Sequence, residues 1–192
     1  MGHSFKSGKA FDMPNALRSI SIAIALLLVL SGVSQAQEIT LTNVPAQVYF
    51  SPCGGCTDAI VGELNKATKE ILVQAYSFTS QPIAKALVDA HKRGVHTEII
   101  LDKSQRGKKY GAADFTAHMG IPTNIDSAHA IAHNKVMVID QETVITGSFN
   151  FTKAAEGRNA ENILILKSRE LAKEYLTNWE KHKEHSEKYE GR

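Results

Sequence analysis

The chain has 192 residues, of which 43% are hydrophobic and 22% are charged, and this is the size and composition of one ordinary globular domain. Its formal net charge is +2. The first 36 residues hold three of the 22 basic residues and one of the 20 acidic residues, so residues 37–192 have 19 of each sign and no net charge. Net charge therefore excludes no partner and supports none, so a nucleic-acid partner must be argued from where the charges cluster.

The first 36 residues are predicted to be a leader and secretory signal peptide. An almost unbroken apolar run, Ile20–Leu30, follows Arg18, and the small residues of a signal-peptidase site end at Ala36. A permanent membrane anchor is the alternative, but the run is shorter than the roughly 20 residues that a spanning helix needs. We expect a mature domain of residues 37–192, periplasmic or secreted, with no stable membrane insertion after cleavage.

After the leader, strand patterns alternate with helix patterns. The predicted strands are residues 46–50, 71–78, 96–101, 121–125, 136–139, 143–146 and 162–166. Four helices are predicted: the first begins near Thr57 or Asp58, the second runs from Ser80 to Gly94, and the third covers residues 115–119. The fourth carries an apolar stripe from Leu171 to Trp179, and the polar tail after it is expected to fray. Trp179 lies in this stripe, which favours core packing. The alternation predicts an α/β fold with a mixed β-sheet between helices on both faces.

The two cysteines stand close together, at Cys53 and Cys56. A zinc site at these positions would need four ligands, and the chain has no second cysteine pair. An oxidising compartment favours a local disulfide in a tight turn. The alternative is two free thiols at the start of a helix.

The most informative pattern has the spacing His-x-Lys-x4-Asp-x6-Gly-Ser-x-Asn and occurs once in the chain. Its polar members are His133, Lys135, Asp140, Ser148 and Asn150. The residues between them are mostly β-branched and apolar, which predicts two short strands joined by a turn. One hairpin could then direct several polar groups at a single point.

These side chains are suited to a phosphate. Lys135 supplies positive charge, Asn150 and Ser148 supply hydrogen-bond donors, and His133 supplies a nitrogen that can attack phosphorus or move a proton. The pattern lacks a cluster of aspartates, so a metal-supported site is disfavoured, and no metal or cofactor is expected. Fixed protein donors would neutralise the charge of the transferred group.

The pattern, together with residues 76–79, 147–155 and 159–162, resembles the phospholipase D superfamily, and within it the small, secreted, single-domain bacterial endonucleases. The similarity runs from about Val48 to Trp179. It implies a phospholipase D-like nuclease domain that hydrolyses phosphodiester bonds of DNA, or of RNA, with little sequence specificity and without metal. One histidine would form a phosphohistidine while a second protonates the leaving oxygen. With one copy of the pattern per chain, a homodimer would bring two copies of His133 into one shared site.

The resemblance also implies roles for the other members. Lys135 and Asn150 would hold phosphate oxygens, and Ser148 would support them or the histidine. Glu161 would accept a hydrogen bond from His133 and fix its tautomer. Asp140 matches the signature aspartate, but strand alternation points it away from His133, so we expect it to have a structural role within the site.

Basic residues near the pattern are candidates for tracking a nucleic-acid backbone. They are Lys103, Arg106, Lys108, Lys109, Lys153 and Arg158. The alternative is a solvated loop. The remaining histidines of the mature chain, His91, His96, His118, His129, His182 and His185, are predicted to be surface or packing residues, with His129 notable for its nearness to His133.

Two rival functions stay open. A phospholipase D or cardiolipin hydrolase would want an apolar rim facing a membrane, and no amphipathic stretch rich in Trp, Phe and Leu follows the signal peptide. A catalytically silent nucleic-acid-binding module would not need a nucleophile such as His133.

Overall fold

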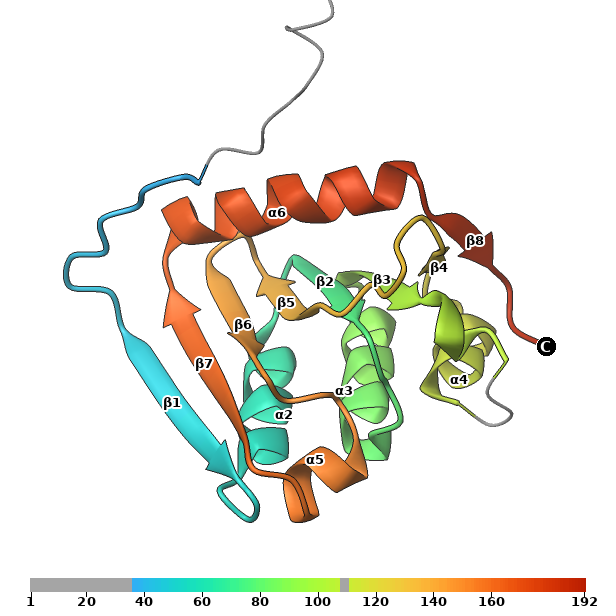
Figure 1. Cartoon of the computed structure of the whole chain (residues 1–192), viewed down its shortest axis with the longest axis horizontal. Helices are drawn as coiled ribbons and strands as arrows, with labels where there is room; N and C mark the ends of the chain where they lie inside the picture. Colours follow the sequence, from blue (N-terminus) through green and yellow to red (C-terminus); the bar gives the residue numbers. More distant parts are fainter. Residues whose placement is uncertain (1–35, 108–110) are drawn as a thin grey trace, which may run out of the picture. The chain divides into compact units, whose positions relative to one another are not determined.

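The computed structural model describes residues 36–107 and 111–192 (Figure 1). The predicted signal peptide, apart from its last residue, lies outside the described residues, as do Lys108 and Lys109 of the predicted basic loop. Residues Ile39–Arg192 form one structural unit. Within the described part of the chain, every helix is too short or too polar to cross a membrane.

An eight-stranded sheet forms the centre of the domain, with the strand order β1-β7-β6-β5-β2-β3-β4-β8. The strands are β1 (Ala46–Ser51), β2 (Glu70–Ala75), β3 (His96–Asp102), β4 (Thr123–Asp126), β5 (Lys135–Ile139), β6 (Thr143–Gly147), β7 (Glu161–Lys167) and β8 (Glu187–Tyr189). β3 runs parallel to β2 and to β4, and the other neighbouring pairs are antiparallel. The predicted mixed sheet is confirmed, with the apolar β2 near its centre.

Helices cover both faces of this sheet, as predicted (Figure 1). They are α2 (Cys56–Lys66), α3 (Gln81–Lys92), α4 (Ala112–His118), α5 (Lys153–Gly157) and α6 (Arg169–Glu184), with a short 3-10 helix η1 (Lys103–Gln105). The larger core lies between the sheet and α2 and α3, and a smaller core on the opposite face packs β-strand side chains against α6. Both layers follow from strands that are apolar on both faces.

Trp179 anchors α6 to the sheet. Its side chain is buried, and its indole Nε1 donates a hydrogen bond of 3.1 Å to the carbonyl of Val73 in β2. A buried indole N–H needs such an acceptor. The prediction that Trp179 packs in the core is confirmed.

The C-terminal tail does not fray as predicted. α6 continues to Glu184, and β8 then pairs antiparallel with β4, with Thr123 opposite Tyr189. The Tyr189 hydroxyl also donates a hydrogen bond to Asp114 of α4. Backbone pairing holds this strand, and its three residues carry no apolar alternation that a sequence pattern could detect.

The start of α2 also differs from the prediction. Its N-cap is Gly55, which adopts a left-handed conformation with φ 78°, and the Thr57 backbone N–H donates a 2.7 Å hydrogen bond to the Glu156 carboxylate of α5. A distant carboxylate thus does what Thr57 or Asp58 was expected to do. Cys53 is exposed and Cys56 is buried in the core, both as free thiols, so the predicted disulfide is not formed in this structure.

Candidate active site

The predicted hairpin is present, and its two ends carry different groups. β5 and β6 pair antiparallel from Val136 opposite Thr146 to Ile139 opposite Thr143. The turn between them places Asp140 and Gln141 at positive φ, 53° and 57°. Lys135 begins β5 and Asp140 follows its end, so at about 3.3 Å per residue the two residues are roughly 16 Å apart along the strand.

His133 and Lys135 form the centre of the site. The Lys135 Nζ lies 3.1 Å from the His133 Nδ1 and donates a 2.7 Å hydrogen bond to the His133 carbonyl. The exposed imidazole also packs on Tyr76, with ring centroids 4.6 Å apart and planes tilted by 54°. The ring is therefore fixed in position from two directions while it remains open to solvent.

Lys135 is buried, with only 7% of its surface exposed. Burial lowers its pKa, and the negative charge of Glu161 partly opposes this effect. A lysine that is partly desolvated in this way gains more from a bound anion than an exposed lysine does. This environment suits a phosphate oxygen.

Ser148 and Asn150 lie just after the end of β6, the strand that pairs with β5. Ser148 is exposed, and its Oγ accepts a 3.1 Å hydrogen bond from the Asn162 backbone N–H. β7 passes so close that a Cβ on Gly147 would lie 2.2 Å from the Asn162 carbonyl oxygen. The Asn150 side chain is half-buried, and its Oδ1 has no hydrogen-bond partner among the described residues. The unpaired atom is an acceptor, so only the Nδ2 of this amide can donate a hydrogen bond to a phosphate oxygen.

Glu161 is not bonded to His133 in the single chain. Its Oε1 accepts a 3.0 Å hydrogen bond from the Asn159 Nδ2. The carboxylate is close enough to act on Lys135 through its charge. The predicted hydrogen bond from His133 to Glu161 is thus absent from this arrangement, because Lys135 occupies the Nδ1 side of the imidazole instead.

Asp140 lies at the far end of β5 from His133 and Lys135, and its contacts are of the structural kind that was predicted for it. Its carboxylate accepts hydrogen bonds of 2.9, 2.8 and 2.9 Å from the backbone N–H groups of Thr68, Lys69 and Glu70. Burial raises the pKa of Asp140, but these hydrogen bonds outweigh burial and hold it below its usual value. The residue ties the hairpin turn to the start of β2.

Asp102 is a site residue that the sequence pattern did not predict. The side chain is buried, and it accepts 2.8 Å hydrogen bonds from the Ala132 and Ser104 backbone N–H groups. The first of these bonds fixes the backbone one residue before His133. An aspartate that ends a buried strand is a weak signal, because its partner is thirty residues away in the sequence.

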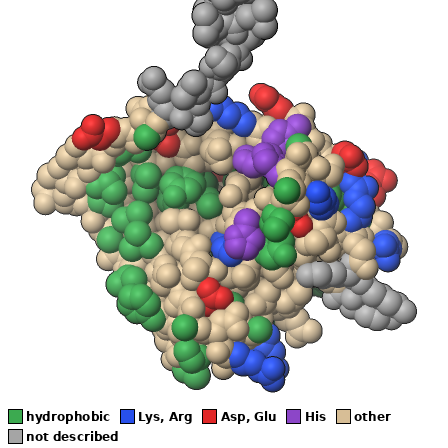
Figure 2. All heavy atoms as spheres, in the orientation of Figure 1, with side chains coloured by type: hydrophobic (Ala, Val, Ile, Leu, Met, Phe, Trp, Pro, Cys, Tyr) green, Lys and Arg blue, Asp and Glu red, His purple; other side chains and the backbone are tan. Residues whose placement is uncertain are grey.

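The four predicted basic residues that the structure describes do not gather into one surface. Lys103 donates a 2.9 Å hydrogen bond to the His129 carbonyl, and Arg106 pairs with Glu187. Lys153 begins α5 and Arg158 caps its C-terminal end, and both are exposed. Figure 2 shows lysine and arginine side chains in separate groups at different edges of this face.

Three histidines that were predicted to be surface or packing residues form a second polar group. His129, His182 and His185 converge on the buried carboxylate of Asp126. The signal for them was present as two short pairs, Asp-x2-His and His-x2-His, but the pairs lie far apart in the chain.

The fold and the site together define a class: a mixed-sheet α/β protein that presents an exposed histidine beside a buried lysine at a strand end. A family model described as "Cardiolipin synthase, PLD-like domain" matches residues 60–183, which is more than half of the chain. The chain belongs to the phospholipase D superfamily, as its sequence pattern indicated.

Relatives and solved structures agree with this assignment. A protein named phospholipase D from Rickettsia conorii is 45% identical over 139 residues, which are 72% of this chain and 70% of the relative. The crystal structure of the phospholipase D family member Nuc from Salmonella typhimurium is 38% identical with a TM-score of 0.74, and the match covers 77% of this chain and 99% of Nuc. NucT from Helicobacter pylori shares the fold at 20% identity, with a TM-score of 0.70 and coverage of 77% of this chain and all of NucT.

Proposed function

We propose that this protein is a metal-independent, nonspecific endonuclease that hydrolyses phosphodiester bonds of nucleic acid, DNA or RNA, through a phosphohistidine on His133. The observation that carries the proposal is the exposed His133 imidazole held beside the buried Lys135 ammonium. Similarity to Nuc over nearly the whole of that small protein supports it as well.

In the proposed first step, a ring nitrogen of His133 attacks phosphorus and forms a P–N bond. The P–O bond to the leaving oxygen breaks, and His133 of a second subunit gives that oxygen a proton. That second histidine then takes a proton from water, whose oxygen attacks phosphorus and breaks the P–N bond. Lys135 and Asn150 stabilise the charge on the phosphate oxygens throughout.

The second histidine must come from a second copy of the chain, and an uncovered apolar surface supports such a homodimer. Val48 and Phe50 of β1 are 56% and 63% exposed, and Ile131 is 56% exposed. Val48 lies opposite Leu164 in β7, and successive pairings across β6 lead to Val136 in β5. Val136 belongs to the smaller core under α6, so Val48 lies on that face of the sheet. Hydrophobic side chains lie on the same side of the molecule as a central histidine (Figure 2). Burial of this surface would stabilise a symmetric pair of subunits.

The test is cleavage of supercoiled plasmid DNA at 25 °C by residues 37–192 in excess EDTA, with the His133→Asn variant beside the wild type. Cleavage that survives EDTA and is lost in the variant would support the proposal. Wild-type turnover by His133→Asn would refute the phosphohistidine, and full activity of a monomer in sedimentation would refute the shared site.

A phospholipase activity is the second candidate, and two observations favour it. The structure exposes the apolar residues Val48, Phe50 and Ile131, whereas the sequence suggested no apolar rim. Several relatives at 43–45% identity are named phospholipase D. Release of head group from phosphatidylcholine vesicles, without plasmid cleavage, would move the assignment to lipid. A binding module without catalysis would show neither reaction.

The proposed location is the periplasm or the medium, and it rests on the predicted signal peptide. N-terminal sequencing of the exported protein tests it, with Gln37 as the expected first residue. An uncleaved N-terminus on a membrane-bound protein would favour the anchor instead.

A further inference from the structure

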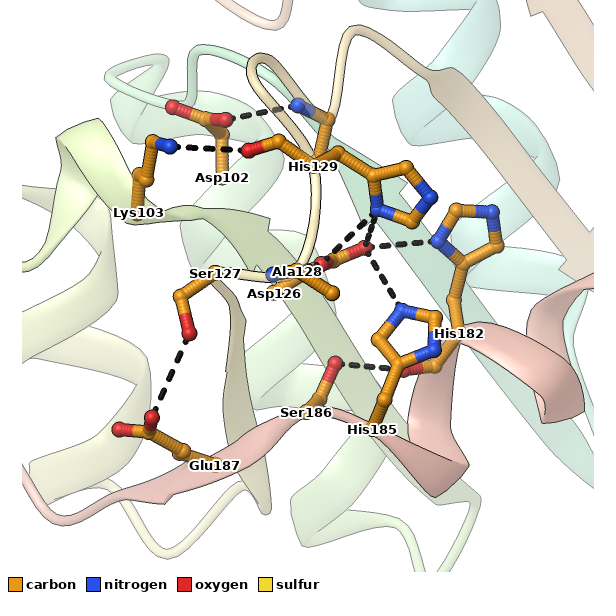
Figure 3. A network of polar contacts seen from close by, with 11 residues as sticks. Asp102, Lys103, Asp126, Ser127, Ala128, His129, His182, His185, Ser186 and Glu187 are labelled. Carbon is orange, nitrogen blue, oxygen red and sulfur yellow. Dashed lines mark hydrogen bonds and ion pairs between the residues drawn. The ribbon is translucent and has the colours of Figure 1, made fainter.

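A cluster of four potential ligand residues lies outside the proposed active site (Figure 3). Asp126 ends β4, His129 lies in the connection from β4 to β5, His182 is in the last turn of α6, and His185 caps the C-terminal end of that helix. One ligand atom from each residue can be chosen so that all four lie within 4.8 Å of one another. Two short segments that are distant in the sequence, residues 126–129 and 182–185, thus meet at one point.

The contacts around Asp126 are unusually crowded. Its Oδ2 lies 3.1 Å from the His129 Nδ1, 2.7 Å from the His182 Nδ1 and 3.3 Å from the His185 Nε2. The imidazole centroids are 4.9 to 5.3 Å apart. Figure 3 shows the three rings facing the carboxylate from different sides.

Four donor groups already face this carboxylate. A carboxylate has about four lone-pair sites on its two oxygens; the His182 and His185 nitrogens face Oδ2, and the His129 Nδ1 lies 3.1 Å from both oxygens. Oδ1 also accepts a 3.1 Å hydrogen bond from the Ala128 backbone N–H. A single divalent cation between the carboxylate and the three imidazoles would satisfy them together.

We propose that Asp126, His129, His182 and His185 bind one zinc ion. Three imidazole nitrogens and one carboxylate oxygen are ligands that zinc accepts in a tetrahedral site, whereas magnesium and calcium prefer oxygen ligands. Tetrahedral zinc with bonds of about 2.0–2.1 Å keeps its ligand atoms about 3.3 Å apart. Two of the three separations from the Asp126 Oδ2, 3.1 Å and 3.3 Å, are close to this spacing, whereas the 2.7 Å separation from His182 would have to lengthen and the imidazole nitrogens would have to approach one another.

The site would join the C-terminal end of α6 to the segment that leads to His133. The His129 carbonyl already accepts a hydrogen bond from Lys103, and Ala132 is held by Asp102. Zinc on the His129 side chain would add a further attachment to the same segment. The ion is structural in this proposal, because its ligands do not include His133 or Lys135, and it takes no part in phosphodiester cleavage.

The experiment uses residues 37–192 purified with a chelator and dialysed into chelator-free buffer. Zinc is titrated and bound metal is counted by mass spectrometry, with magnesium as the cation that should not bind. We expect about one zinc ion per chain, and a rise in Tm of roughly 5–10 °C when zinc is present at a hundred times its Kd. Cobalt should bind in its place and give the visible absorption of a tetrahedral site.

Variants of the two more exposed ligands, His129→Ala and His185→Ala, keep the fold most easily, and circular dichroism checks this. Each should weaken zinc binding at least tenfold and reduce the rise in Tm. The matched control is His96→Ala, because His96 is an exposed histidine outside the cluster. Absence of bound zinc in the wild type, or equal zinc binding by wild type and both ligand variants, would overturn the site. Plasmid cleavage is measured separately, so failure of the zinc site leaves the proposed nuclease untouched.

Discussion

The two ends of β5 carry polar side chains in opposite states. At its start, the exposed imidazole of His133 contacts Lys135, whose charged form is disfavoured by burial. After its end, Asp140 accepts hydrogen bonds from three consecutive backbone N–H groups. The first arrangement leaves capacity for a ligand, while the second is satisfied within the protein. Members of one sequence signature can therefore serve chemistry at one end of a strand and stability at the other.

The largest effect is expected for His133→Asn. Loss of the nucleophile should lower phosphodiester turnover roughly 10³-fold or more. Because the ring is exposed, the free energy of unfolding should change by less than about 0.5 kcal/mol. Plasmid cleavage and urea denaturation measure the two quantities, and His96→Asn is the control. A large loss of stability would show that His133 is a structural residue.

Lys135→Met tests how much the positive charge at the start of β5 contributes to turnover. Removing the ammonium should lower turnover roughly 10²-fold, since it stabilises charge on the phosphate. Stability should stay equal or rise slightly, because the variant no longer buries a charge. Lys173→Met, on the exposed side of α6, is the matched control. Turnover within twofold of wild type would remove Lys135 from the site.

Asp140→Ala should have the reverse profile. It leaves three backbone N–H groups without their acceptor and should cost about 1–3 kcal/mol of unfolding free energy. Turnover of the folded protein at 25 °C should remain within a few-fold of wild type. Asp89→Ala removes a half-buried aspartate whose ion pair is with the surface residue Lys85, and it serves as control. A large loss of turnover at unchanged stability would return Asp140 to the active site.

The smallest effect is the pH dependence of the Asp140 contribution. Its pKa is lowered in the folded protein, so the contribution is fully present above the unfolded pKa of about 3.9 and is lost as pH falls through the lower folded value. The stability difference between wild type and Asp140→Asn should therefore shrink below about pH 4. A difference that stays constant from pH 6 to pH 3 would contradict the assigned role of the carboxylate.

Local patterns predicted the parts of this molecule that local interactions determine. The hairpin between His133 and Asn150 followed from β-branched residues around a turn, and the α6 stripe ending at Trp179 followed from helical spacing. The capping of α2 by Glu156, the β8 strand and the Asp126 cluster depend on contacts between segments far apart in the chain. No periodicity reports such contacts, and the histidines of the cluster look like surface residues until α6 is docked.

The pairing of β1 with β7 has a consequence for how the domain is made. Ala46 lies opposite Leu166, so the first strand of the sheet to be synthesised waits for one of the last before it has a neighbour. Such a sequence-distant pairing slows folding, since a long loop must close before the contact forms. Until β7 has formed, the backbone N–H and C=O groups of β1 have no neighbouring strand, so the nascent chain presents an unpaired strand that can associate with other chains.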